Sequence, residues 1–98
     1  MIEIKSKERA YLRSEAQTLD PVVYIGKNGL TDSVVKALSD ALDSHELVKV
    51  RFQASKEETR EISESLAGKT GAILVATTGF TAVFYKRNPD PAKRKYFL

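Results

Sequence analysis

The chain has no cysteine among its 98 residues and only one histidine. Without cysteine there is no disulfide framework, thiolate metal site or thiol nucleophile, and a small domain without such cross-links is typical of a reducing compartment. No apolar run approaches the ~20 residues that span a bilayer, and the first residues lack the pattern of a signal peptide. We therefore expect a cytoplasmic protein that is neither secreted nor inserted in a membrane.

Sequence motifs of catalysis and of nucleotide binding are also missing. Metal or acid–base chemistry at His45 needs partner residues at defined positions, and no HxxxH or HxH pair occurs. The pair Gly26-Lys27 is not part of a P-loop, because Pro21 and Asn28 occupy the positions of its first glycine and its Ser/Thr. We expect no enzyme activity, cofactor, small-molecule substrate or metal site, and we assign His45 a structural role at a helix end.

Charge is abundant but nearly balanced in this chain. Sixteen Lys/Arg against thirteen Asp/Glu give a net charge of +3, which by itself is a weak indicator of nucleic-acid binding. The hydrophobic fraction of 42% and the length of 98 residues fit one ordinary globular domain. The distribution of the charge along the chain is therefore more informative than its total.

The hydrophobic pattern alternates between helical and strand periodicity. Apolar residues recur at helical spacing in three segments, while β-branched and aromatic residues form four short runs bounded by turn residues. We predict helices at 7–19 after a Ser6 cap, at 31–44 and from a Ser55 cap to Gly68, and strands at 21–25, 47–52, 72–77 and 80–86. This α-β-α-β-α-β-β order predicts an α/β fold with a mixed four-stranded sheet, in which the last two strands form a hairpin.

A Gly-x-x-Gly turn separates the first predicted strand from the second helix. Glycine and asparagine readily take positive φ, so Gly26-Lys27-Asn28-Gly29 predicts a tight turn. A turn of this kind exposes backbone N–H groups near the positive end of a helix dipole, and Lys27 adds a cation, so the motif suits a phosphate. A plain strand-to-helix turn has the same signature, and the motif alone leaves both interpretations open.

Acidic and basic residues are segregated between two of the predicted helices. In the first helix Arg9 and Arg13 are spaced i, i+4 and project from one side, with Lys5 one turn earlier. The third helix carries four glutamates, whose spacing fits a capping box and a solvated face better than a metal site. These glutamates are Glu57, Glu58, Glu61 and Glu64.

The last segment, residues 89–98, is a second basic region. Its prolines cannot donate to a sheet ladder and its cations repel one another, so we expect a mobile tail after a domain of residues 1–88. Tyr96 and Phe97 can either stack on bases or pack on the sheet, and the sequence leaves both open. The tail supplies three further candidates for nucleic-acid contact: Lys93, Arg94 and Lys95.

Two paired motifs are more specific than the turn alone. GKNGLT at 26–31 is followed by HELVKVRF at 45–52, and both accompany ERAYLRSEAQTLDPVVYIGK at 8–27 and a glycine, Gly79, before the last strand. In this combination the chain resembles the CRM domain, the chloroplast RNA splicing and ribosome maturation family, and specifically its stand-alone bacterial YhbY-like members. The resemblance spans about residues 6 to 88.

The resemblance implies a fold similar to the C-terminal domain of translation initiation factor three, and RNA binding without catalysis. Bacterial members are associated with precursor particles of the large ribosomal subunit, and plant relatives with group II intron splicing. The family's GxxG loop falls on Gly26, Lys27, Asn28 and Gly29, and its basic helix surface on Lys5, Lys7, Arg9 and Arg13.

From these observations we predict a monomeric RNA-binding protein that holds precursor ribosomal RNA through phosphate contacts and assists assembly of the large subunit. The alternative is a protein-interaction module that docks on a ribosomal protein or assembly factor through its sheet or hairpin. Salt dependence separates the two, because phosphate contacts release counterions. Binding to double-stranded DNA lacks support, since no helix-turn-helix spacing occurs.

Overall fold

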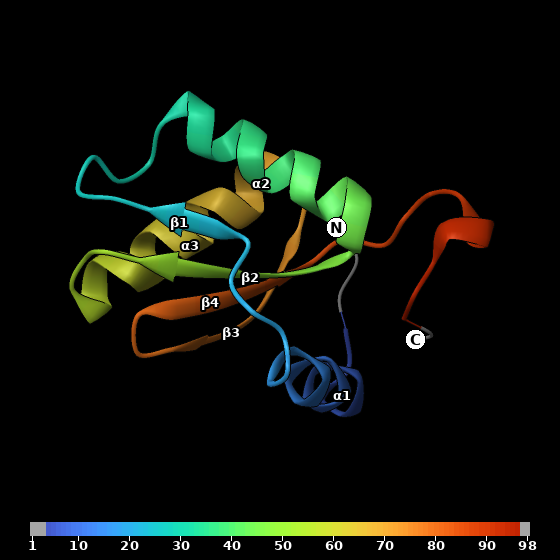
Figure 1. The fold of residues 1–98 in the computed structure, drawn as a ribbon. Coiled ribbons are helices and arrows are strands. Elements are labelled where there is room, and N and C mark those ends of the chain that lie inside the picture. The colour runs from blue at the N-terminus through green and yellow to red at the C-terminus, as the bar shows by residue number, and fades with distance from the viewer. Residues whose placement is uncertain (1–3, 97–98) are drawn as a thin grey trace.

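The computed structural model describes residues 4–96, and its element order confirms the predicted α-β-α-β-α-β-β sequence (Figure 1). A short 3-10 helix follows the last strand. The elements are α1 (Ser6–Ala16), β1 (Val23–Ile25), α2 (Asp32–His45), β2 (Leu47–Phe52), α3 (Lys56–Thr70), β3 (Ile73–Thr78), β4 (Thr81–Tyr85) and the 3-10 helix Pro91–Lys93.

The strands form one mixed four-stranded sheet, as the sequence predicts, and their order in the sheet is β1-β2-β4-β3. β1 and β2 are parallel and connected by α2, whereas β2, β4 and β3 are antiparallel neighbours. The helices α2 and α3 cover one face of the sheet and α1 lies on the other (Figure 1). The domain therefore has three layers, and β1 and β3 are its edge strands.

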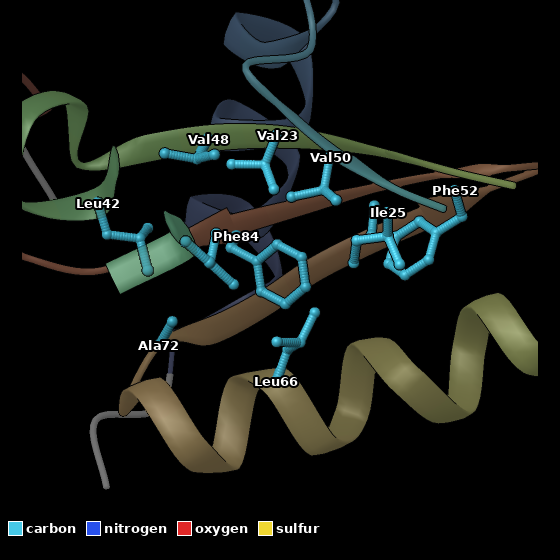
Figure 2. Packing of buried hydrophobic residues seen from close by; sticks show 11 residues of the cluster. Val23, Ile25, Leu42, Val48, Val50, Phe52, Leu66, Ala72 and Phe84 are labelled. Carbon is cyan, nitrogen blue, oxygen red and sulfur yellow. The ribbon is translucent and has the colours of Figure 1, made fainter. Parts of the chain in front are cut away.

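The main core lies between the sheet and the pair α2 and α3. Phe84 of β4 is fully buried among side chains from β1, β2 and α3 (Figure 2). In β2, Val48, Val50 and Phe52 point into this core, as their alternation with polar residues predicts. This face of the sheet is closed by apolar packing.

A second cluster lies under α1, on the opposite face of the sheet. Leu12 and Ala16 of α1 pack on Leu47, Val83 and Tyr85 near the start of β2 and the end of β4. The helix covers only this part of the face, as the exposure of Arg51 at the far end of β2 shows. Among residues 4–96, none of the three helices is both long and apolar enough to cross a membrane.

The first helix is shorter than the predicted span 7–19 and is capped differently. Ser6 is its first residue rather than its cap, and the Lys5 N–H donates to the Glu8 carboxylate at 2.9 Å. The helix ends at Ala16, and the Lys49 ammonium, reaching from β2, donates to the carbonyls of Ala16 and Leu19 at 3.3 and 3.4 Å. These carbonyls at the helix end are satisfied from another element, which sequence periodicity does not show.

The third helix is longer than predicted, and the assignment of Gly68 as its terminating residue is wrong. Gly68 lies inside α3, while Gly71 takes the left-handed conformation, with φ of +73°, that ends the helix. The additional turn is held by Thr70, whose buried hydroxyl donates to the Leu66 carbonyl and whose carbonyl accepts from the Lys86 ammonium at 2.9 Å.

The C-terminal segment is packed, and the expectation of a mobile tail is wrong for residues 89–96. The buried carboxylate of Glu46 accepts hydrogen bonds from the backbone N–H groups of Asn88 at 2.7 Å, of Tyr96 at 3.3 Å and of Lys95. A buried carboxylate needs such donors, and satisfying it outweighs repulsion between neighbouring cations. The tail therefore folds back against the junction of α2 and β2.

Of the two tail aromatics, the structure describes Tyr96. Its ring lies edge-on to Tyr11 and to Tyr85, with centroid separations of 6.5 Å in both pairs. Tyr96 thus packs on the domain, which was one of the two interpretations left open by the sequence. Phe97, the second aromatic of that interpretation, lies outside the described residues.

Candidate nucleic-acid interface

The Gly-x-x-Gly turn lies at the end of β1, between that strand and α2 (Figure 1). It is closed by a hydrogen bond from the Gly29 N–H to the Gly26 carbonyl at 3.1 Å. Gly29 has φ of +67°, whereas Gly26 and Asn28 keep negative φ, so one residue rather than several requires left-handed backbone. An added Cβ at Gly29 would also contact Ile62 of α3 at 3.6 Å.

The rest of the turn faces solvent. Gly26, Lys27 and Asn28 are exposed, and within residues 4–96 no hydrogen bond or ion pair engages the Lys27 side chain. Two residues beyond Gly29, Thr31 caps α2 by accepting from the Val34 N–H at 3.2 Å. The turn therefore presents an unengaged ammonium and backbone donors beside the N-terminus of a helix of 14 residues.

The guanidinium group of Arg9 on α1 is hydrogen-bonded to the backbone of β3. Its Nη1 donates to the carbonyls of Leu74 and Val75, both at 2.7 Å. These carbonyls lie at an irregularity of β3, where the register with β4 shifts between Leu74 and Ala76. A bulge re-aims the backbone of a strand, and here two successive carbonyls reach one guanidinium. Arg9 thereby ties α1 to the edge strand.

Arg13, one turn further along α1, is exposed and borders a hollow of about 270 Å³ between the helix end and the sheet. Lys49, Thr78 and Thr81 line the same hollow. Arg13 thus lies toward the end of the sheet at which β3 turns into β4. The structure therefore separates the i, i+4 pair: Arg9 is held against β3 and Arg13 remains at the surface.

The other predicted cations lie elsewhere. Lys5 and Lys7 are exposed at the beginning of α1, about 12 Å and about 9 Å along the helix axis from Arg13 at 1.5 Å per residue. In the C-terminal segment Arg94 Nε donates to the Asn88 carbonyl at 2.8 Å and Lys95 Nζ to the Ser44 carbonyl at 3.1 Å. Lys93 is exposed in the same segment. This segment lies at the opposite end of the sheet from the Gly-x-x-Gly turn (Figure 1).

Two exposed residues beside the turn were not among the candidates from the sequence. Tyr24 of β1 is 67% exposed, although Val23 and Ile25 on either side are buried. Arg51 of β2 lies directly opposite Tyr24 in the parallel ladder and is also exposed. The period of two would have indicated Tyr24, because a residue between two core positions points to the other face of the sheet.

The acidic residues lie on a different surface. Glu57, Glu58, Glu61 and Glu64 are all exposed on α3, which packs on the sheet face opposite α1. Glu64 forms the ion pair with Arg60 at 3.5 Å. Within residues 4–96, no group of three or more His, Asp or Glu side chains is arranged to hold a metal ion. Arg13 and Arg51 are therefore separated by the sheet from the glutamate-rich surface.

The fold and the exposed turn define an α/β domain with cations at one end of its sheet, and comparison with known proteins specifies the class. The model of the CRS1 / YhbY (CRM) domain matches residues 4–86, nearly the whole chain. The chain belongs to this family. The family expected from the paired motifs is thereby confirmed.

Individual proteins show the same relationship. The chain is 34% identical to "Probable RNA-binding protein YqeI" of Bacillus subtilis over 89% of its length and 92% of the relative's. It is 36% identical to a protein of Haemophilus influenzae named "RNA-binding protein", over 92% of each chain. The solution structure of the hypothetical protein SAV1595 from Staphylococcus aureus matches with a TM-score of 0.82 at 31% identity, covering 95% of this chain and 98% of that one.

Proposed function

We propose that this protein binds RNA in the cytoplasm, that its partner is precursor ribosomal RNA of the large subunit, and that it assists ribosome assembly. The names of its relatives support RNA as the ligand, and those relatives align over nine-tenths of the chain. The ribosomal partner follows from the family resemblance described above. The observation that carries the proposal is the exposed Gly-x-x-Gly turn with the unengaged Lys27 ammonium.

The proposed contact is with the sugar-phosphate backbone. Lys27 and the backbone N–H groups of the turn other than that of Gly29, which closes the turn, take a phosphate, as a GxxG loop does in KH domains on a different fold. Arg13 supplies a second cation toward the same end of the sheet. The remaining candidates on α1 are Lys5, Lys7 and Arg9, and those in the C-terminal segment are Lys93, Arg94 and Lys95. Phosphate contacts position the RNA without reading its sequence.

Replacing Lys27 with alanine tests this proposal. We expect Lys27→Ala to weaken binding to large-subunit ribosomal RNA fragments and to lower the log–log salt slope by roughly one unit, since one phosphate contact is lost. Lys69→Ala is the matched control, because Lys69 is also an exposed lysine and lies in the last turn of α3, away from the Gly-x-x-Gly turn. Affinity is measured by fluorescence anisotropy over a range of salt concentrations, with a melting curve for each variant.

Identical affinity and salt slope for Lys27→Ala and Lys69→Ala would remove the turn from the interface. Crosslinking in cells, followed by sequencing of the bound RNA, tests the partner. Enrichment of precursor large-subunit RNA is the expected result, and a set of unrelated messenger RNAs would contradict it. Association with ribosomal particles that does not change with salt would favour docking on a protein instead.

A further inference from the structure

At the end of the sheet near the Gly-x-x-Gly turn, α1 leaves part of its sheet face uncovered. The strand registers place Tyr24 opposite Arg51, Arg51 opposite Thr81, and Thr81 opposite Thr78. Residues opposite one another in a ladder point to the same face, so these four side chains form one row across all the strands. Tyr24, Arg51 and Thr78 are exposed.

Two hollows lie beside this row. One of about 360 Å³ is lined by Tyr24, Gly26 and Arg51, which makes it continuous with the first residue of the Gly-x-x-Gly turn. The other, of about 270 Å³, is bordered by Arg13 and Lys49. None of the residues that line either hollow in the described part of the chain carries a carboxylate. The surface therefore combines an exposed aromatic ring with cations and lacks anionic groups.

We infer that this row is a stacking platform for an unpaired RNA base, with the ring of Tyr24 as the stacking surface and Arg51 as its cationic neighbour. The inference rests on the proposed RNA-binding function and specifies its substrate as single-stranded RNA. An aromatic ring with a cation beside it accepts any base, because every base has a π-face and the adjoining phosphate is anionic. Bases in a duplex are stacked on each other and are not available to the ring.

A role in base stacking explains the exposure of Tyr24, whereas packing does not. A residue with two-thirds of its surface in solvent contributes little to the core, and Val23 and Ile25 already fill the core positions of β1. Gly26 lines the hollow beside Tyr24, so a strand bound at the turn passes directly next to the ring. One nucleotide can thereby have its phosphate at the turn while a neighbouring base stacks on Tyr24.

The test compares Tyr24→Ala, Tyr24→Leu and Tyr24→Phe for binding a short single-stranded RNA and a blunt-ended duplex of the same sequence. We expect Tyr24→Ala to lose about five- to 150-fold in affinity for the single strand, because stacking of one base is worth about 1–3 kcal/mol. Tyr24→Leu keeps apolar area without a ring and loses most of the same affinity, whereas Tyr24→Phe retains it. Binding of the duplex is expected to remain unchanged in all three variants.

The salt dependence of binding distinguishes the role of Arg51 from that of the Tyr24 ring. Tyr24→Ala keeps the wild-type salt slope, while Arg51→Ala lowers it by about one unit, because only the arginine neutralises a phosphate. A melting curve for each variant shows that the fold is retained. A base analogue whose fluorescence is quenched by stacking reports the contact directly, and the quenching is expected to disappear in Tyr24→Ala and to persist in Tyr24→Phe.

The inference is overturned if Tyr24→Ala binds the single strand as tightly as the wild type while Lys27→Ala binds it more weakly. In that case RNA binding stands and the platform does not. If the wild-type protein binds neither RNA, the proposed function and the platform fall together. If Tyr24→Ala binds RNA normally but no longer associates with ribosomal particles, the surface is a protein-docking site, which also overturns the platform.

Discussion

The two ends of the sheet differ in how many of their cations are engaged by hydrogen bonds. At the end where β2 begins, Lys86, Arg94 and Lys95 donate to backbone carbonyls and the C-terminal segment covers Glu46. At the other end, Lys27 and Arg51 are exposed, and no hydrogen bond or ion pair among residues 4–96 engages their side chains. The number of cations therefore does not separate the two ends, whereas the hydrogen-bond partners of those cations do.

We call the end of the sheet where β2 begins, which the C-terminal segment covers, the closed end. Glu46 is the residue on which this end depends. It is 1% exposed, and among residues 4–96 it is the only non-glycine residue with a positive φ, which is 61°. A side chain other than glycine is strained in this conformation, and the strain persists only where surrounding contacts impose it. Here the backbone joins the end of α2 directly to β2, and the carboxylate binds three N–H groups of the C-terminal segment.

The largest effect on stability is expected from Glu46→Ala. Removing the carboxylate leaves three backbone donors without their acceptor, and the free energy of unfolding should fall by about 2–4 kcal/mol. The loss stays below the sum of three charged hydrogen bonds because the segment can detach and return its N–H groups to water. Urea denaturation measures the change. Affinity for RNA, extrapolated to the folded fraction, should be retained.

Glu46→Gly separates the carboxylate from the backbone strain. Glycine adopts positive φ without a Cβ penalty, so Glu46→Gly should be more stable than Glu46→Ala by about 1 kcal/mol while losing the same hydrogen bonds. If both variants are as stable as the wild type, the closed end does not depend on Glu46. If RNA affinity falls in parallel with stability, the two ends are not independent.

A second comparison sets Arg9 against Arg13, which share a helix and are one turn apart. Arg9→Ala removes two hydrogen bonds to β3 and should lower the free energy of unfolding by about 1–3 kcal/mol. Arg13→Ala should leave stability within about 0.5 kcal/mol, since its side chain is exposed, and should weaken RNA binding. Denaturation and anisotropy on both variants provide the comparison.

The expected pattern is a crossed one: stability is lost with Arg9 and affinity with Arg13. Arg9→Lys refines it, because lysine keeps the charge but not the planar group that reaches two carbonyls, and it should restore little stability. Equal losses of affinity in Arg9→Ala and Arg13→Ala, with stability unchanged in both, would return Arg9 to the RNA surface.

Much of the fold could be predicted from the sequence because its signals are local. The alternation from Leu47 to Phe52 gives β2 with the observed bounds, and Thr31 gives the start of α2. The errors occur where a distant element decides the outcome. Lys49 binds the Ala16 carbonyl at the end of α1 across 33 residues, and Glu46 binds Asn88 across 42. The short sequence windows from which helices and strands are predicted do not contain both partners of such a contact.

The candidate site could be predicted only in part for a related reason. The Gly-x-x-Gly turn is contiguous in sequence, so its residues are identified together. Tyr24 and Arg51 become neighbours only through the parallel register of β1 and β2, which the chain pattern does not specify. Conversely, the spacing of Arg9 and Arg13 predicts a common side of the helix, but the bulge in β3 that engages Arg9 is set by tertiary structure.

The smallest predicted effect concerns the two tyrosines at the closed end. Burial raises the pKa of Tyr85 above its usual value of 10.0, and the nearby Glu46 carboxylate raises it further. Burial also raises the pKa of Tyr96, with Glu15 as the next cause. Both groups are neutral at lower pH, so they contribute full stability below pH 10 and lose it as the pH rises through and above that value.

Melting curves between neutral pH and pH 11 should therefore show a decline in stability above about pH 10, because the unfolded chain releases these protons first. Tyr85→Phe should flatten this decline at little cost, because the Tyr85 hydroxyl is buried without a hydrogen-bond partner among residues 4–96. Tyr96→Phe should flatten the decline as well. The matched control is Tyr24→Phe, which removes an exposed hydroxyl at the opposite end of the sheet. A decline of the same steepness in Tyr85→Phe, Tyr96→Phe and the wild type would show that the alkaline sensitivity arises outside the closed end.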